Sequence, residues 1–248
     1  WLQEGSIVLR RFFNEGKRVD DGRFAQCSEA VRQYVERLRE QHRRHGRSAR
    51  AYRLELHALS MVRALDELEQ SIYCAQKLCS GIAGVQESEL PEEMRDEYHR
   101  HLYFYKNAFI RIFATLDKLG YFMNEAFELR TEKSKPKYSY FTVLRQLRAV
   151  GKHPRLEAAL TACKLEFHEP MQRLRKKRNV EVHLINAEVL DDLQAMEREY
   201  WESQRIENLK ANMDDLRSGW EMVSRSMHLV FAYAGEHAKP SGSKPKNG

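Results

Sequence analysis

Hydrophobic positions recur at intervals of three and four residues over most of the chain, which is the spacing of one buried face of an α-helix. This pattern predicts an all-α fold in which consecutive long helices pack antiparallel as a bundle. The first residues, 1–20, contain an apolar patch that fits either a short strand or a packed helix. The predicted helices span 23–44, 50–83, 91–129, 140–150, 155–163, 169–183 and 205–238, with a further helical stretch near 189–196.

The same spacing predicts which side chains of each long helix face the core. In the helix over 50–83, Ser48 is placed to cap the first turn. Its buried face is expected to contain Leu56, Leu59, Val62, Leu65, Leu68, Ile72, Ala75, Cys79 and Ile82. The inner face of the next helix is expected to contain Met94, Tyr98, Leu102, Tyr105, Phe109, Ile112, Phe113, Leu116 and Leu119.

Composition agrees with long helices and sets few limits on partners. The 248 residues suffice for one large or two small domains, and only 12 are Gly and 6 are Pro. A formal net charge of +6 permits a polyanionic partner without requiring one. The four cysteines form no C-x-x-C pair, so we expect reduced, buried thiols of a cytoplasmic protein. His99 and His101, two residues apart on a helix, point to different faces, and we expect no metal or cofactor.

No apolar run is long enough for a membrane-spanning helix, and no signal peptide is visible. The most apolar stretch, 104–127, is interrupted by charged residues that include Lys106, Arg111, Asp117 and Lys118, so we expect no membrane association. The sequence begins at Trp1 rather than Met, which is consistent with missing native N-terminal residues. Residues 239–248 are rich in Pro, Ser, Gly and Lys, and we expect a disordered tail there.

The richest candidate chemistry lies in the predicted helix over 169–183, where Pro170 fits a first helical turn. Asn179 and His183 stand one turn apart on this helix, and Arg178 lies about 100° round from Asn179. The three polar groups therefore occupy one sector of the helix. The preceding cations are Arg173, Arg175, Lys176 and Lys177.

These residue types could supply the groups that phosphodiester cleavage without a metal ion requires. His183 can act as base or acid because the ordinary pKa of histidine, about 6.5, leaves both protonation states available. Arg178 can present a bidentate fork to phosphate oxygens and neutralise the transition state, and Asn179 can orient the imidazole or the phosphate. We expect the four preceding cations to bind neighbouring phosphates.

The spacing of Arg178 and His183 alone is a poor signal in so arginine-rich a chain. The looser pattern of Arg and His separated by four to six residues also occurs elsewhere, for example at Arg37 and His42 or at Arg148 and His153. The alternative reading is that Asn179 hydrogen-bonds a neighbouring helix end. In that reading His183 lies near a helix C-terminus because its cation suits the helix dipole.

Two segments together resemble a known family. The block Arg178-Asn179-x-x-x-His183 looks like the signature of the HEPN superfamily, named for its presence in higher eukaryotes and prokaryotes. A second segment, Asp117-Lys118-Leu119-Gly120-Tyr121-Phe122-Met123-Asn124 followed by Tyr138-Ser139-Tyr140-Phe141, is similar to its poorly characterised bacterial branch. The resemblance implies an α-helical HEPN-like bundle over 91–238, with residues 1–90 as a packed helical extension.

For function, the resemblance implies an endoribonuclease, such as a toxin or defence effector with an antitoxin protein as partner. It also implies a two-fold homodimer in which Arg178, Asn179 and His183 of both subunits form one cleft. Asp117 is the carboxylate expected to orient the His183 imidazole and raise its pKa.

Two other functions remain open from the sequence. The chain could be a non-catalytic HEPN-like module that binds RNA, a nucleotide or a protein, or a structural dimerisation bundle. Binding without turnover would favour the first, and the absence of nucleic-acid affinity would favour the second. The RNA substrate and the role of the N-terminal helices are not specified by any motif.

Overall fold

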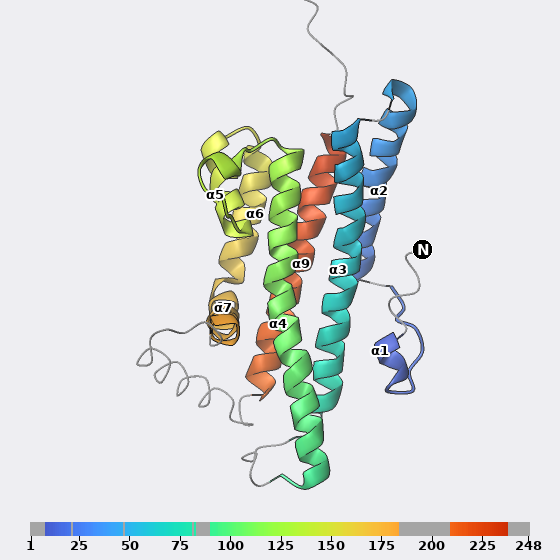
Figure 1. Cartoon of the computed structure of the whole chain (residues 1–248), viewed down its shortest axis with the longest axis vertical. Coiled ribbons are helices and arrows are strands. Elements are labelled where there is room, and N and C mark those ends of the chain that lie inside the picture. The colour runs from blue at the N-terminus through green and yellow to red at the C-terminus, as the bar shows by residue number, and fades with distance from the viewer. Residues whose placement is uncertain are drawn as a thin grey trace, which may run out of the picture. The chain divides into compact units, whose positions relative to one another are not determined.

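The computed structural model describes residues 8–20, 22–46, 48–80, 82, 90–183 and 209–237 (Figure 1). These ranges contain helices and turns without a β-strand, so the all-α prediction is confirmed. The tail at 239–248 and the helical stretch near 189–196 lie outside the described residues. The helices are α1 (Val8–Arg11), α2 (Gly22–His45), α3 (Ala49–Cys79), α4 (Glu92–Ala126), α5 (Tyr140–Val150), α6 (Pro154–Glu166), α7 (His168–His183) and α9 (Leu209–Glu236), with a 3-10 turn η3 (Thr131–Lys133).

The chain forms two compact units, each assembled from three separate stretches of sequence. The first unit comprises residues 1–18, 66–113 and 166–222, and the second comprises 19–65, 114–165 and 223–248. The long helices α3, α4 and α9 each contribute residues to both units.

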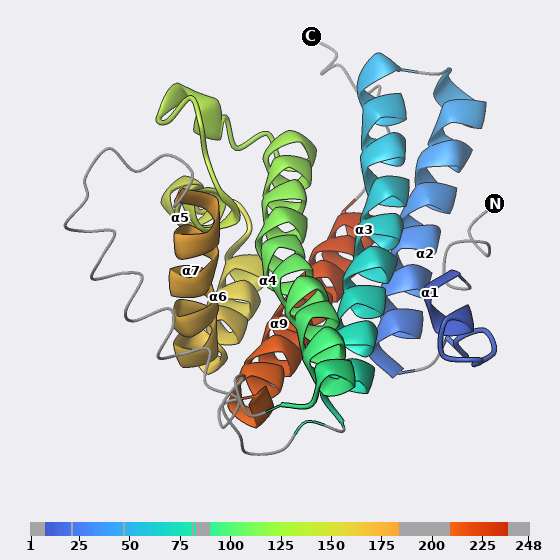
Figure 2. The ribbon, with the colours of Figure 1, turned by 60° about the horizontal axis from the view of Figure 1, so that its bottom comes forward.

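In the first unit, α3 and α4 run antiparallel (Figure 2). Arg111 pairs with Glu67, Ser71 donates to the Asn107 amide oxygen at 2.9 Å, and His101 Nδ1 contacts the Ala75 carbonyl at 2.8 Å. Residue numbers therefore rise along α3 as they fall along α4. Since His101 is fully buried, burial lowers the pKa of its imidazole.

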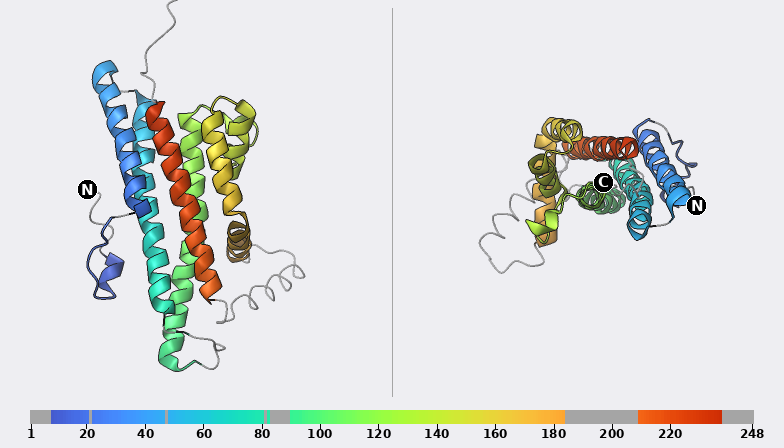
Figure 3. Two further views of the ribbon diagram at one scale, coloured as in Figure 1. Left: turned by 180° about the vertical axis from the view of Figure 1, so that it is seen from behind. Right: turned by 90° about the horizontal axis from the view of Figure 1, so that it is seen from above.

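In the second unit, α2 packs against α3 and α9 (Figure 3). The Cys27 thiol donates to the Ser224 carbonyl at 2.9 Å, and the Tyr34 ring meets the Phe231 ring edge-on at 5.7 Å. Residue numbers rise together along α2 and α9, so these two helices are parallel. Tyr34 also meets Phe122 of α4 at 5.4 Å, which makes an aromatic centre for this unit.

Most of the predicted core is confirmed, with one correction in α3. Leu56 was expected to face the core, but its side chain is 47% exposed. Leu54 and Ala58 are buried instead, because the helical period runs back from Leu65 through 61, 58 and 54.

The predicted cap of α3 is confirmed, since the Ala51 backbone N–H donates to Ser48 Oγ at 3.1 Å.

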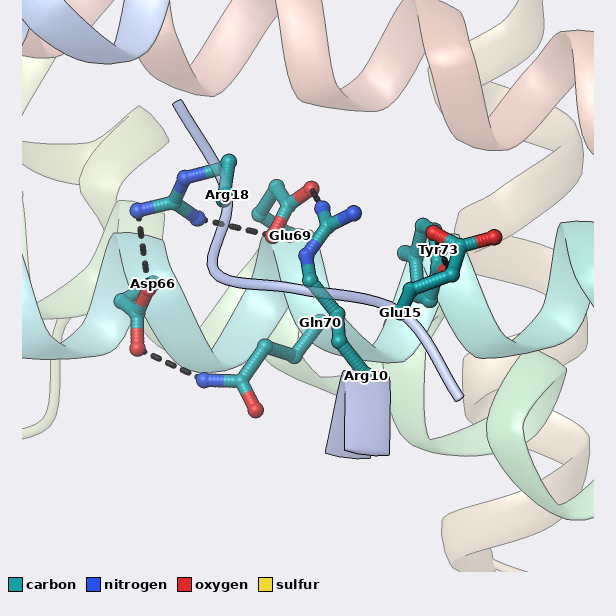
Figure 4. Close-up of polar contacts among 7 residues, drawn as sticks. All are labelled: Arg10, Glu15, Arg18, Asp66, Glu69, Gln70 and Tyr73. Atoms are coloured by element: carbon teal, nitrogen blue, oxygen red, sulfur yellow. Dashed lines mark hydrogen bonds and ion pairs between the residues drawn. The ribbon is translucent and has the colours of Figure 1, made fainter. Parts of the chain in front are cut away.

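Residues 8–20, which we call the N-terminal strap, dock on α3 through charged side chains (Figure 4). The strap begins with the short helix α1, so the open choice between strand and helix resolves as helix. Arg18 pairs with Glu69 at 2.7 Å and with Asp66 at 2.9 Å, and Arg10 also pairs with Glu69. These four side chains are only 11–19% exposed, so the ion pairs are largely shielded from water. The Arg10 guanidinium lies 3.8 Å from the Tyr73 ring centroid.

Candidate functional site

Helix α7 carries the candidate site, and its apolar residues fix it in the first unit. Met171, Leu174 and Val180 are buried on this helix. Leu174 approaches Gly219 of α9 so closely that a Cβ at residue 219 would lie 3.1 Å from its Cδ1. A Cβ there would also lie 2.4 Å from the Cδ1 of Ile112 on α4, so a larger residue at 219 would displace both of these side chains.

Three polar side chains spaced four residues apart on α7, at positions 173, 177 and 181, form a polar row that contacts α4 and α9. Arg173 forms a bidentate pair with Asp215 of α9, with N–O distances of 2.9 and 2.7 Å. Four residues on, Lys177 Nζ donates to the Tyr105 hydroxyl of α4 at 3.0 Å and to the Asn212 amide oxygen of α9. After another four residues, Glu181 pairs with Lys106 of α4 at 3.0 Å. The row holds α7 at a defined rotation about its own axis.

Lys177 has a shifted pKa for a lysine. Burial of the ammonium group lowers its pKa from the usual 10.5 to about 8, against the opposing attraction of Asp215. The nearby Arg173 guanidinium lowers it further. A substantial fraction of Lys177 is therefore neutral at mildly alkaline pH.

Arg178 adjoins this row and packs against α4. Its guanidinium carbon lies 5.1 Å from the ring centroid of Phe113. The side chain is half-buried, and its Nε is buried without a hydrogen-bonding partner among the described residues. A buried donor without a partner costs free energy, so packing against Phe113 holds this nitrogen away from water at a cost.

Asn179 lies on another row of α7, four residues after Arg175 and four before His183. The side chain of Asn179 is half-buried, whereas Arg175 and Lys176 are exposed. His183 is the last residue of α7, and its side chain lies outside the described part of the chain. The structure thus places Arg178, Asn179 and His183 within the last turns of one helix.

The four cations expected to bind phosphates have two different environments. Arg175 and Lys176 are exposed, while Arg173 and Lys177 are engaged by groups of the protein itself. The acceptors Asn212 and Asp215 were missed by the sequence reasoning. Both are buried polar residues on the core side of α9, where they interrupt an otherwise apolar face. That interruption was the available signal.

Asp117 belongs to the second unit, where its role in the structure is local. Its Oδ1 accepts a hydrogen bond from the Tyr140 backbone N–H at 2.9 Å, at the first residue of α5. This is the bond that an N-terminal cap supplies to a helix. Its expected action on His183 stays a prediction.

Two further findings concern metal binding and membrane spanning by the described residues. No group of three or more His, Cys, Asp or Glu side chains among them is arranged to hold a metal ion. Within the same ranges, no helix combines the length and apolar character that crossing a bilayer requires.

Comparison with known proteins places this helical arrangement in a family. A family profile described as HEPN_Cthe2314-like HEPN matches residues 58–235, well over half of the chain. The chain belongs to this HEPN family. No curated protein and no solved structure matches the chain. The HEPN match begins inside α3 and extends through α4 to nearly the end of α9, so it includes both α7 and the α4 segment that contains Asp117.

Proposed function

We propose that this HEPN protein is a metal-independent endoribonuclease whose catalytic groups are Arg178, Asn179 and His183. The observation that carries the proposal is the position of Arg178 beside Asn179 in the last turns of α7, with its guanidinium carbon 5.1 Å from the Phe113 ring centroid. Asn179 on the following position and His183 one turn beyond supply an amide and an imidazole on the same helix end.

In the proposed reaction, an imidazole takes the proton of the ribose 2′-OH as that oxygen attacks the adjacent phosphorus. The bond to the 5′-oxygen breaks, and this leaving oxygen takes a proton, giving a 2′,3′-cyclic phosphate and a free 5′-hydroxyl. Arg178 neutralises the pentavalent phosphorane through two parallel N–H donors, and Asn179 orients phosphate or imidazole. Arg175 and Lys176, both exposed, bind neighbouring phosphates in this proposal, while Arg173 and Lys177 fix the helix.

One imidazole does not readily serve as acid and base in the same step, so the proposal includes a homodimer. In a two-fold dimer, His183 of each subunit supplies one of the two roles. Asp117 is retained in the proposal as the carboxylate that orients His183. A toxin or defence role with an antitoxin partner is the biological setting that the family resemblance suggests.

The test is cleavage of several structured and unstructured RNAs by the full chain in excess EDTA. We expect 2′,3′-cyclic phosphate ends from the wild type and a loss of at least about 100-fold in rate for His183→Ala and Arg178→Ala. Arg178→Lys should remain defective because an ammonium cannot form the bidentate fork. His99→Ala, which alters an exposed histidine on α4, is the matched control and should cut at the wild-type rate.

The proposal fails if the wild type leaves all RNAs intact or if the His183 and Arg178 variants cut as well as it does. RNA that is shifted in a gel but not cut would instead favour a non-catalytic binding module. Sedimentation of the wild type should give a dimer, and a strict monomer with full activity would remove the composite site from the proposal.

A further inference from the structure

In the second unit, one face of α4 contacts the loop over 128–139. Four positions on this face contact the loop or the residue that ends it: Asp117, Gly120, Tyr121 and Asn124. Asp117 accepts from the Tyr140 backbone, as described above. Gly120 allows close approach, since a Cβ there would lie 2.9 Å from the Tyr140 Cα. The face therefore serves to fix the loop in one conformation.

Asn124 is the main polar anchor of this loop. Its Oδ1 accepts from the Thr131 backbone N–H at 2.9 Å. Its Nδ2 donates to the Glu132 carboxylate at 2.9 Å and to the Tyr138 hydroxyl at 3.1 Å. One side chain thus joins three residues of the loop, and the first of them, Thr131, is fully buried.

The backbone of the loop adopts a conformation that its residues disfavour. Glu128 and Arg130 have φ of 53° and 56°, in the left-handed region that favours glycine. Each such residue costs on the order of 1 kcal/mol and persists only where surrounding contacts impose it. At Glu128 this conformation ends α4, since the Leu129 N–H donates to the Asn124 carbonyl at 3.1 Å as in a helix C-cap, and Arg130 precedes the 3-10 turn η3.

The loop carries several exposed cations and, at Tyr138, one ring of a contacting pair of tyrosines. The exposed cations on it and on the adjoining turn of α4 are Lys118, Arg130, Lys133, Lys135 and Lys137. The two acidic residues of the loop have partners within the second unit. Glu128 forms an ion pair with Arg50 at 2.6 Å, and Glu132 accepts a hydrogen bond from Asn124. The Tyr121 ring is 47% exposed and lies 4.8 Å from the Tyr138 ring, which it meets at 47°.

We propose that Tyr121, Tyr138 and the cations of the 128–139 loop form a docking surface for a single-stranded polynucleotide. Exposed cations neutralise successive phosphates, and an exposed tyrosine face stacks on an unpaired base. Bases in a duplex are already stacked, so the surface selects single strands. The polynucleotide chemistry is shared by RNA and DNA. The docking surface does not require the proposed endoribonuclease activity. It rests on that activity only where it names RNA as the strand that is held during cleavage.

The experiment measures binding of the full chain to a labelled 12-nucleotide 2′-O-methyl oligouridylate, which has no 2′-OH nucleophile and cannot be cut. Lys135→Gln with Lys137→Gln should weaken binding by about tenfold at low salt and flatten its salt dependence. Tyr121→Ala should weaken it by roughly fivefold or more, while Tyr121→Phe keeps the stacking face and should bind as the wild type does. The matched control is Arg43→Gln with Arg44→Gln, which removes two exposed cations from α2.

A DNA oligonucleotide and an RNA duplex of the same length form the other arms. Equal binding of the two single strands with weak duplex binding supports the proposal, and RNA preference identifies the 2′-oxygen as an added contact. Equal loss in the loop and control pairs, or tight duplex binding, overturns it. The proposal is also overturned if the Lys135→Gln, Lys137→Gln double variant and Tyr121→Ala both bind as the wild type does, with unchanged melting temperatures. That result would favour a protein as the partner of this loop. Because the probe cannot be cleaved, a failed RNase assay does not decide this result.

Discussion

Lys177 shows how a single charge can serve structure rather than ligand binding. Its ammonium group is held between the Tyr105 hydroxyl and the Asn212 amide, beneath the sector of α7 that carries Arg178 and Asn179. Burial lowers its pKa to about 8, so the folded state releases this proton more readily than the unfolded chain does. The adjacent Arg173 and Asp215 pair keeps charge near the lysine without touching its nitrogen.

The pH dependence of stability follows from the direction of this shift. Between pH 8 and pH 10.5 the unfolded lysine holds more protons than the folded one, so the free energy of unfolding rises with pH. Below pH 8 both states are protonated, and the contribution no longer changes. Relative to Lys177→Met, the wild type should gain about 1 to 2 kcal/mol between pH 7 and pH 10, measured by urea unfolding. A constant difference across this range would contradict the lowered pKa.

Gly120 gives a second prediction at the residue scale. In Gly120→Ala the new Cβ meets the backbone of Tyr140, which cannot rotate away as a side chain could. We expect the free energy of unfolding to fall by about 1 to 3 kcal/mol, despite the better helix propensity of alanine. Gly16→Ala is the control, because nothing lies within 4 Å of its added Cβ. A neutral Gly120→Ala variant would show that α4 and the start of α5 can separate at little cost.

At the scale of elements, the pattern of α7 was predictable and its environment was not. Apolar spacing and Pro170 predict the helix to within a residue of its observed start, and they place Asn179 one turn before His183. They do not reveal that Arg173 and Lys177 turn toward other helices. That depends on Tyr105, Asn212 and Asp215, which lie far away in sequence and become neighbours only when α4 and α9 pack. Similarly, sequence resemblance singled out Asp117 and Asn124 but not the loop that both hold in place.

The N-terminal strap supplies the prediction for this scale. Glu69→Gln removes the charge that pairs with both Arg10 and Arg18 in a shielded position. We expect local docking of the strap to weaken by on the order of 2 kcal/mol, since one partner of each buried pair is lost. Amide hydrogen exchange over residues 8–20 should become faster by more than tenfold, with α9 unaffected. Glu40→Gln on α2, at an exposed position, should leave the exchange unchanged.

Across the whole molecule, the sequence predicts the class of fold better than its division. Periodicity and length give the order and approximate limits of the helices, because these depend on local spacing. The limits of the two compact units do not fall at residue 90. The division into an extension over 1–90 and a HEPN-like bundle over 91–238 stays a prediction. The unit limits depend on pairings such as Ser71 with Asn107, which no local pattern encodes. The error at Leu56 has a local origin, since repeated three-residue steps back from Leu65 drift away from the 3.6-residue helical period.

A truncation tests how strongly the N-terminal helices support the rest. A fragment comprising residues 91–248 lacks α3, so His101, Asn107 and Arg111 of α4 lose their partners in the first unit. We expect this fragment to lose the cooperative thermal transition of the full chain, followed by circular dichroism. A fragment that melts as sharply as the full chain would mean that residues 91–238 fold independently of α3.

The pairing of α2 with α9 has a consequence for synthesis of the protein on the ribosome. Cys27 and its hydrogen-bonding partner Ser224 are 197 residues apart in the chain. At the usual rates of translation, α2 emerges roughly 10 to 40 s before the helix that completes its packing. During that interval the buried face of α2, including Tyr34 and Val35, has no α9 to cover it. We expect chaperones that bind apolar helices to cover this face until α9 has emerged and packed against α2.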